Sequence, residues 1–299
     1  MSTVPRSPEV VVYGTVCLDI LARVRTPDSP MTEAVEFPGG EAFNTATALA
    51  GWEVNVLLTG TAIGADVEGD RLRQLLDHHP LGLPRTFVPD IPTATTPVCQ
   101  VRVTPDGERY MSGRGFREAV APPPLPEPVL ATRPIFAVDP NLGEAAVLET
   151  VRAASFGCSI VAMDFGHRED IVALSRIVVE SRERLLRQGR TDPPETLAAG
   201  WVAAGAQTAI VTLGAEGCVV ADRADGVFPV PAFSVSPIVD TTGAGDTFRA
   251  GLCYGLLRGM SLQRTVRFAT AAAALHCQTS GGGSRIPISN ILALMDGTS

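Results

Sequence analysis

The sequence contains no lysine, so arginine supplies every permanently charged side-chain cation. This absence excludes a Walker A phosphate loop, whose lysine contacts the β- and γ-phosphates of a nucleotide, and it excludes Schiff-base chemistry on a side chain. Any phosphate group that the protein binds must therefore be held by backbone amides, by arginine or by a metal ion.

The sequence also lacks a long apolar run, an excess of basic charge and paired cysteines. No stretch approaches the roughly 18 uninterrupted apolar residues that a membrane span requires, and no small-residue signal cleavage site follows residues 1–9. The net charge of −8 argues against a nucleic-acid surface, for which a basic stripe is expected. The six cysteines form no CxxC pair or zinc-like spacing. We therefore expect a cytoplasmic protein with reduced thiols and without a membrane or nucleic-acid partner.

Short β-branched runs alternate with helix-periodic segments along most of the 299 residues. We expect strands at residues 10–13, 54–58, 135–138, 159–163 and 208–212, and helices at 41–50, 70–78 and 145–154. Strands that alternate with helices indicate a mostly parallel sheet that is covered on both faces. Nothing in the pattern suggests a second core, so the prediction is an α/β fold in a single domain over residues 1–299.

Two segments interrupt this alternation. Residues 21–38 alternate loosely between apolar and polar and contain Pro27 and Pro30, which suits short exposed strands better than a helix. Residues 97–103 and 109–112 flank a Pro-Asp-Gly turn, which favours a β-hairpin. Together they predict a small accessory sheet, built from segments at approximately 21–37 and 95–116.

Residues 240–248 read Asp-Thr-Thr-Gly-Ala-Gly-Asp-Thr-Phe and lead into an apolar, helix-periodic segment. Glycines just before a helix leave backbone N–H groups unobstructed, and the helix N-terminus adds positive potential. The segment therefore predicts a phosphate cradle that needs no lysine. Asp246, at the helix start, can also be a simple helix cap, and this is the better interpretation of an isolated Gly-x-Gly-Asp.

The segment at 240–248 resembles the C-terminal signature of the ribokinase-like carbohydrate kinases, also called the phosphofructokinase-B family. Residues 38–46, Pro-Gly-Gly-Glu-Ala-Phe-Asn-Thr-Ala, resemble the N-terminal signature of the same family, and Gly60, Gly64 and Asp66 follow at the matching distance. The resemblance implies a ribokinase-like three-layer α/β/α sandwich with a mostly parallel central sheet and a small β-sheet lid. It also implies ATP-dependent phosphorylation of a hydroxyl group on a sugar or sugar derivative.

The resemblance assigns roles to both signatures. It makes Asp246 the catalytic base, and it makes the backbone of Gly243, Ala244 and Gly245 the anion hole for the transferring phosphoryl group. The sugar side is implied to comprise an early aspartate, the Gly-Gly turn, the signature asparagine and an arginine of the lid hairpin: Asp19, Gly39, Gly40, Asn44 and Arg109. In this family the lid excludes water and often forms the dimer contact, so we also expect a homodimer through the lid.

The nucleotide side is also implied by the resemblance. Its residues are Thr212, Gly214, Gly217, Thr241 and His276, and residues 271–277 and 281–283 are expected to close over the adenine. A histidine in an apolar segment is otherwise more often structural. The implied cofactors are ATP and Mg²⁺. Because many relatives hold a monovalent cation near the first aspartate of the signature, Asp240 and Thr242 are candidates for supporting K⁺.

Two motifs of the family are altered in this chain. Residues 164–168, Asp-Phe-Gly-His-Arg, stand where relatives usually carry Asp-Pro-Asn-x-Arg. The magnesium-associated Asn-x-x-Glu motif is Glu-Ser-Arg-Glu at residues 180–183, which keeps Glu183 as the magnesium candidate but replaces the asparagine. Arg168 and Arg249 are expected to contact phosphate because no lysine shares that task.

Two other functions stay open. A nucleoside kinase of the same fold would share the Gly-Ala-Gly-Asp apparatus, but its base-stacking surface would have few candidates beyond Phe37, Phe43 and Tyr110, because aromatic residues make up only 5% of the chain. A non-catalytic sugar or nucleotide sensor would have no need of a base at Asp246. Both considerations favour a sugar kinase. The missing Gly-x-Gly-x-x-Gly after the first strand argues against a dinucleotide-binding oxidoreductase.

Overall fold

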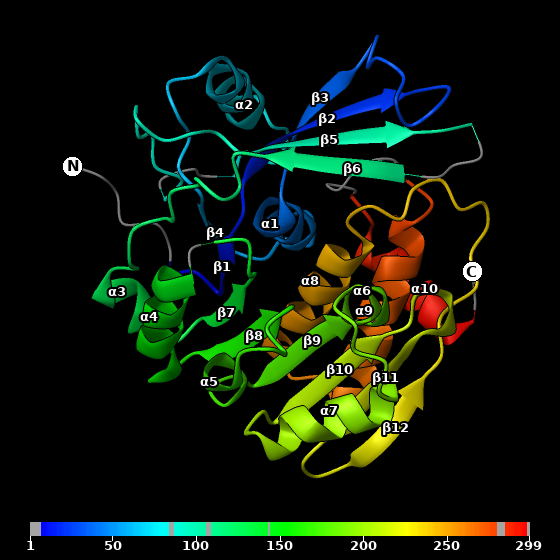
Figure 1. Ribbon diagram of the computed structural model, residues 1–299. Helices are drawn as coiled ribbons and strands as arrows, with labels where there is room; N and C mark the ends of the chain where they lie inside the picture. Colours follow the sequence, from blue (N-terminus) through cyan, green and yellow to red (C-terminus); the bar gives the residue numbers. More distant parts are fainter. Residues whose placement is uncertain (1–6, 84–86, 106–108, 143, 280–284, 298–299) are drawn as a thin grey trace.

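The computed structural model describes residues 7–83, 87–105, 109–142, 144–279 and 285–297. In these residues, eight strands form a central sheet in the order β12-β11-β10-β9-β8-β7-β1-β4 (Figure 1). Neighbouring strands are parallel from β4 through β10, and β11 and β12 add an antiparallel hairpin at one edge. The bounds of the strands are β1 (Val10–Gly14), β4 (Val56–Gly60), β7 (Ile135–Val138), β8 (Ser159–Met163), β9 (Ile177–Ser181), β10 (Thr208–Thr212), β11 (Cys218–Asp222) and β12 (Gly226–Val230).

Helices cover both faces of the central sheet, because alternate strand residues point to opposite sides. Val10 and Val12 pack on one side, whereas Val11 and Tyr13 pack on the other. The first side is covered by α1 (Glu41–Gly51), α8 (Ala244–Leu257), α9 (Leu262–His276) and α10 (Ile288–Asp296). The second is covered by α3 (Glu127–Leu130), α4 (Glu144–Ser155), α5 (Glu169–Val172), α6 (Arg182–Arg187) and α7 (Pro194–Ala203). The predicted three-layer α/β/α sandwich is confirmed. Within the described ranges, every helix is too short or too polar to cross a bilayer.

A second sheet, which we call the lid sheet, has the strand order β3-β2-β5-β6 and lies at the top of Figure 1. Its strands are β2 (Cys17–Arg23), β3 (Val35–Gly39), β5 (Val98–Val103) and β6 (Arg109–Arg114). Helix α2 (Val67–Asp77) packs on it, with ion pairs from Arg71 to Glu36 and from Arg114 to Glu68. The segments predicted for the accessory sheet contain β5 and β6, whereas β2 begins before the first segment and β3 ends after it.

Polar residues follow several parallel strands at their carboxyl ends. Thr15 follows β1, Asp139 follows β7, Asp164 follows β8, and Thr212 ends β10. Parallel strands bring these ends to one edge of the sheet, and ligands of open α/β sheets bind outside that edge. We call it the carboxyl edge, and it is the expected location of a ligand site.

Candidate active site

The glycines of the C-terminal signature form the turn that starts α8. Gly243 is the N-cap and has a left-handed backbone conformation (φ 81°), which glycine adopts without the strain that a side chain would add. The N–H of Thr247 donates to the carbonyl of Gly243 at 2.9 Å. Earlier N–H groups of the first turn, including that of Gly245, have no acceptor inside the helix. The glycine turn therefore lies at a helix start, where an anion is stabilised, and its role as a phosphate cradle stays a prediction.

Asp246 lies in the first turn of α8 and is only 6% exposed. The Nδ2 of Asn44, in α1, donates to Oδ2 of Asp246 at 2.9 Å. The hydroxyl of Thr45 donates to the main-chain carbonyl of Asp246 at 3.4 Å. The two signatures, which lie 202 residues apart at this contact, therefore meet at the Asp246 carboxylate.

Three further acidic side chains surround Asp246, and we call Glu41, Asp139, Asp164 and Asp246 the carboxylate cluster. Burial raises the pKa of Asp246 to about 7, the charge of Arg249 opposes this rise, and Asp139 and Asp164 add to it. Burial and the like charges of the other three carboxyl groups raise the pKa of Glu41 well above its usual range. A carboxyl group with a pKa near neutrality is suited to accept a proton in catalysis.

Asp139 belongs to this cluster, although the family resemblance assigned it no role. It is completely buried and accepts hydrogen bonds from the N–H and the hydroxyl of Thr15, at 2.9 and 3.1 Å. A Cβ on Gly14 would lie 1.7 Å from Oδ2 of Asp139, so glycine leaves room for this carboxylate. Asn141 then donates to Oε1 of Glu41 at 2.9 Å. The available signal was the position of Asp139 directly after a buried strand.

Arg249 is completely buried, one turn after Asp246 on α8. Its Nε donates to Oγ1 of Thr45 at 3.0 Å, and its Nη2 donates to the main-chain carbonyl of Glu41 at 2.8 Å. Nη2 lies 4.0 Å from Oδ1 of Asp246. The prediction that Arg249 contacts phosphate is wrong, because its side chain does not reach the surface.

The sugar side of the predicted site lies where β2, β3 and α1 meet. The Cys17 thiol donates to Oδ1 of Asp19 at 3.2 Å, and burial raises the pKa of Asp19 to about 6. A Cβ on Gly39 would lie 2.1 Å from the carboxyl carbon of Asp19, so glycine leaves room for this carboxylate where it stands. Gly40 caps α1 with φ 98°, and a Cβ there would lie 2.3 Å from the carbonyl oxygen of Thr15. The structure therefore brings Asp19, Gly39 and Gly40 together at the start of α1.

The predicted nucleotide side begins at the end of β10. Thr212 ends this strand, and Gly214 begins a short 3₁₀ helix, η1 (Gly214–Glu216), that Gly217 closes before β11. Gly217 has φ 98°, and a Cβ there would lie 2.1 Å from the carbonyl oxygen of Val230. In the described residues, no hydrogen bond joins this turn to the carboxylate cluster. The turn lies at the carboxyl edge of the central sheet, and the glycine turn of α8 borders the same edge.

His276 is completely buried behind the glycine turn. Its Nε2 lies 2.6 Å from the carbonyl oxygen of Thr242, and its Nδ1 lies 2.9 Å from the hydroxyl of Thr247. The N–H of Thr242 donates to Oδ1 of Asp240 at 2.7 Å, and Thr241 belongs to the same turn. His276 has no exposed surface, and both of its ring nitrogens contact the turn, so it supports the turn from behind; its predicted contact with a nucleotide stays a prediction.

The altered magnesium motif separates its two glutamates. Glu183 has a side chain that is 83% exposed, and it pairs with Arg187 at 3.5 Å. Glu180 is buried on β9, and burial together with the charge of Asp164 raises the pKa of Glu180 to about 7. No set of three or more His, Cys, Asp and Glu side chains in the described part of the chain could hold a metal ion. A single exposed carboxylate such as that of Glu183 fits Mg²⁺ only where the ion is bound together with ATP, because the phosphates then supply most of its ligands.

Three further predicted contacts, those of Arg109, residues 281–283 and Arg168, stay predictions. Arg109 begins β6, but its side chain lies outside the described part of the structure, as do residues 281–283, which were expected to close over the adenine. Arg168, the other arginine expected at phosphate, pairs with Asp170 at 3.0 Å.

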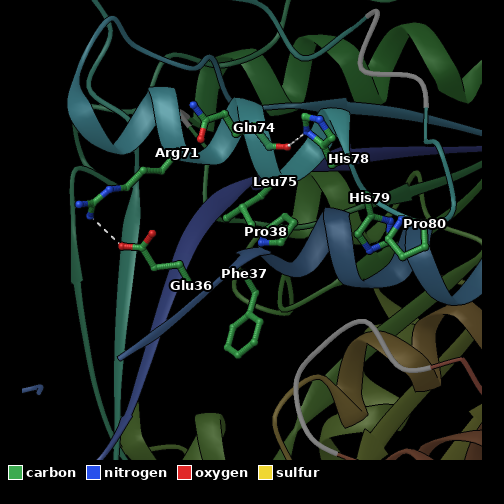
Figure 2. Close-up of a pocket in the computed structure, with 9 residues that line it drawn as sticks. All are labelled: Glu36, Phe37, Pro38, Arg71, Gln74, Leu75, His78, His79 and Pro80. Atoms are coloured by element: carbon green, nitrogen blue, oxygen red, sulfur yellow. Dashed lines mark hydrogen bonds and ion pairs between the residues drawn. The ribbon is translucent and has the colours of Figure 1, made fainter. Parts of the chain in front are cut away.

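A cavity of about 380 Å³ lies between β3 and α2 (Figure 2). Glu36 and Arg71 form an ion pair at 2.7 Å beside it, and His79 packs edge-on against Phe43 of α1, with ring centroids 5.2 Å apart. The residues that line the cavity are Glu36, Phe37, Pro38, Arg71, Gln74, Leu75, His78, His79 and Pro80. Its wall includes the residue before the Gly-Gly turn but no member of the carboxylate cluster.

The fold and the paired signatures define a kinase of the ribokinase type. Residues 7–132 and 171–289, which make up most of the chain, match the pfkB family carbohydrate kinases. The chain belongs to this family and is a sugar or nucleoside kinase.

Three relatives illustrate the similarity. The chain is 28% identical over 276 residues to a cytidine kinase of Thermococcus kodakarensis, covering 87% of this chain and 92% of that protein. The structure of Arabidopsis thaliana ribokinase complexed with ribose and ATP is similar with a TM-score of 0.80 and 22% identity, covering 97% and 99% of the two chains. A Burkholderia thailandensis nucleoside kinase in complex with inosine is similar with a TM-score of 0.74 and 20% identity, covering 96% of each chain. The two structural similarities show the shared fold.

Proposed function

We propose that the protein transfers the γ-phosphoryl group of ATP to a hydroxyl group of a sugar or sugar derivative, with Asp246 as the general base. The observation that carries this proposal is the position of the Asp246 carboxylate. It lies in the first turn of α8, directly after the glycine turn. It is hydrogen-bonded to Asn44 of α1, the helix that follows the turn at Gly39 and Gly40, which we call the sugar-side turn. A base and an anion-binding turn at one helix start suit in-line phosphoryl transfer.

In the proposed reaction, the acceptor oxygen forms a bond to the γ-phosphorus while the bond to ADP breaks, and Asp246 takes the hydroxyl proton. A pKa of about 7 leaves Asp246 partly ionised at neutral pH and still basic enough to accept that proton. The N–H groups of the turn at Gly243, Ala244 and Gly245 stabilise the charge on the phosphoryl oxygens. Mg²⁺ bound with ATP supplies further charge neutralisation, and Glu183 is our candidate for its contact with the protein.

The sugar side of this proposal consists of Asp19, Gly39, Gly40 and Asn44. The carboxylate of Asp19 and the two glycines lie together at the start of α1. Carboxylate oxygens accept hydrogen bonds from sugar hydroxyls, and glycine permits a ligand to approach the backbone closely. On the nucleotide side we keep Thr212, Gly214, Gly217 and Thr241 as the proposed contacts for ATP.

A nucleoside is the second candidate acceptor, and one observation favours it. Leu21 pairs in register with Val35 and Val101, and Val101 pairs with Met111, so these four apolar residues form a row across the lid sheet. Leu21 lies two residues from Asp19 on the same strand and therefore shares its face. Val35 is 53% exposed and Met111 is 62% exposed. Val101 is buried within this row, so the exposed apolar residues at its two ends, Val35 and Met111, offer the surface for a nucleobase.

Two finer features of the proposal rest on the family resemblance. We propose that Asp240 and Thr242 support a monovalent cation, and the hydrogen bond from the Thr242 N–H to Asp240 supports a defined turn there. Turnover that is equal in K⁺ and in Na⁺ buffers would remove this feature. We also propose a homodimer through the lid sheet, which light scattering of the purified protein tests directly.

The decisive test of the function combines one substitution with a panel of acceptors. We expect ADP release from ATP to be stimulated by at least one member of a panel of pentoses, hexoses, sugar acids, sugar phosphates and nucleosides. Asp246→Asn is nearly isosteric and should reduce that turnover by about 10³-fold or more, while ADP binding and thermal unfolding stay close to wild type. Turnover near the wild-type rate in Asp246→Asn would refute the base, and no stimulation by any acceptor would favour a sensor.

A further inference from the structure

Arg249 joins the two helices that carry the proposed base and the sugar-side turn. It leaves α8 one turn after Asp246 and is completely buried. Its Nε and Nη2 both donate to the hydroxyl oxygen of Thr45, at 3.0 and 2.7 Å, and Nη2 also donates to the main-chain carbonyl of Glu41 at 2.8 Å. The Thr45 hydroxyl in turn donates to the carbonyl of Asp246 at 3.4 Å. These contacts fix the first turn of α8 against the first turn of α1.

The charge of Arg249 faces acidic groups from each element packed around it. Helix α1 contributes Glu41, α8 contributes Asp246, and the residues after β7 and β8 contribute Asp139 and Asp164. Asp246 is the member of the carboxylate cluster that lies within 4.0 Å of the guanidinium. A guanidinium does not lose its proton in proteins, so it favours the ionised form of the acid beside it.

We infer that Arg249 is a positioning residue that keeps the Asp246 carboxylate ionised and fixed against the sugar-side turn without touching the substrate. The inference rests on the proposed function of Asp246 as the base. Without this cation, the four carboxyl groups of the cluster would share a poorly solvated site, and Asp246 would hold the proton that it must lose before it can accept one from a hydroxyl group.

The electrostatics of the site agree with this geometry. Burial raises the pKa of Asp246, and Arg249 is the largest influence that lowers it; Asp139 and Asp164 act with burial. The same guanidinium lowers the pKa of Asp139, whereas the burial of Asp139 raises it. Its Nη1 has no hydrogen-bond partner in the described residues. The positive charge of Arg249 therefore acts on all four carboxyl groups of the carboxylate cluster, and Asp246 is the nearest of them.

The test measures the ionisation of Asp246 with and without turnover. In the ligand-free protein, the side-chain carboxyl ¹³C signal of Asp246, assigned by its loss in Asp246→Asn, is titrated by NMR. The dependence of kcat on pH is measured with ATP and either D-ribose or cytidine as acceptor. In Arg249→Gln we expect the NMR midpoint and the acid limb of kcat to rise by about one pH unit or more, because one pKa unit is a tenfold change in the ionised fraction.

Arg249→Lys separates the charge from the hydrogen bonds. A lysine keeps the charge but cannot present the planar guanidinium that contacts both Thr45 and the Glu41 carbonyl. We expect its Asp246 midpoint to stay within about 0.5 pH units of wild type, and its kcat to fall by about tenfold at every pH because Asp246 is less well fixed. The matched control is Arg258→Gln at the other end of α8, where the arginine is 41% exposed, and it should change neither readout.

An unchanged Asp246 midpoint in folded Arg249→Gln overturns the inference, and so does a loss of kcat that is equal at all pH values. If thermal unfolding shows that Arg249→Gln does not fold, Thr45→Val decides, because it removes the hydroxyl that holds Arg249 but keeps the charge. A wild-type midpoint and wild-type kcat in Thr45→Val also overturn it. Wild-type turnover in Asp246→Asn would instead refute the proposed base, and the NMR midpoints would still report on Arg249.

Discussion

The Nδ2 of Asn44 lies 2.9 Å from Oδ2 of Asp246, and this hydrogen bond joins the two signatures of the family across the contact between α1 and α8. Both residues are buried. An amide N–H favours the ionised form of a carboxylate, because it donates to the charged oxygen and has no charge of its own to titrate. Asn44 therefore orients the proposed base from the helix that begins at the sugar-side turn.

Replacing this amide is expected to slow the reaction. Asn44→Leu has a similar shape but no donor, and a hydrogen bond to a charged group contributes about 1.5–3 kcal/mol. We expect kcat to fall by about 10- to 100-fold and its acid limb to move to higher pH, as measured by coupled ADP release. Thr47→Val is the control on the same helix, because the Thr47 hydroxyl donates to the carbonyl of Phe43. A rate within twofold of wild type in Asn44→Leu would mean that this bond does not serve the base.

A methyl group at position 39 is expected to damage acceptor binding specifically. In Gly39→Ala the Cβ would lie 2.1 Å from the Asp19 carboxyl carbon, so the carboxylate must move. We expect KM for the acceptor to rise by about tenfold or more while KM for ATP stays near wild type, because the displaced group lies on the sugar side. Gly200→Ala, in α7 with no atom within 4 Å of its Cβ, should leave both constants unchanged. Equal increases in the two KM values would argue against a sugar-side role for Asp19.

The fold was largely predictable because its signals are local. The β-branched runs at 10–13 and 208–212 became β1 and β10, and the glycine turn at 243 starts a helix as predicted. The antiparallel hairpin of β11 and β12 was not predicted, because the residue pattern of a strand is the same whether it runs parallel or antiparallel to its neighbour. The alternation of strands and helices sets the layers but not the direction of an edge strand.

The surroundings of the base were predicted less well. Its acidic neighbours come from separate elements: Glu41 begins α1, Asp139 follows β7 and Asp164 follows β8. Only the packing of α1 and α8 on the sheet brings them to Asp246. Arg249 was expected at phosphate because the chain has no lysine, yet its spacing of one turn from Asp246 directs it into the α1 contact. Long-range packing decides such positions, and one sequence carries no signal for it.

His276 gives a prediction about the glycine turn. Its ring contacts the Thr242 carbonyl and the Thr247 hydroxyl, and it is completely buried. His276→Ala should lower the free energy of unfolding by about 2–4 kcal/mol, because it leaves a cavity and two unpaired polar groups. It should also raise KM for ATP more than KM for the acceptor. Urea unfolding and steady-state kinetics measure the two effects. His78→Ala is the exposed control, and a larger effect on the acceptor KM would place His276 on the sugar side.

Glu180 makes the stability of the protein depend on pH in a defined direction. Burial raises its pKa to about 7, whereas an unfolded glutamate titrates near about 4.3. Between these values the native state holds a proton that the unfolded state has lost, so the contribution of Glu180 is present at low pH and disappears as pH rises through 7.

Glu180→Gln cannot ionise, so its free energy of unfolding relative to wild type should increase from pH 5 to pH 8, by about 1–3 kcal/mol. Trp201 packs on Gly166 beside Glu180, so its fluorescence reports urea unfolding close to the substituted side chain. Glu183→Gln changes a side chain that is 83% exposed and should give a difference that does not vary with pH. A constant difference between Glu180→Gln and wild type would show that Glu180 does not titrate in this range, because the charge of Arg184 and the Gly166 N–H, which donates to Oε1 of Glu180, would then hold it as a carboxylate throughout.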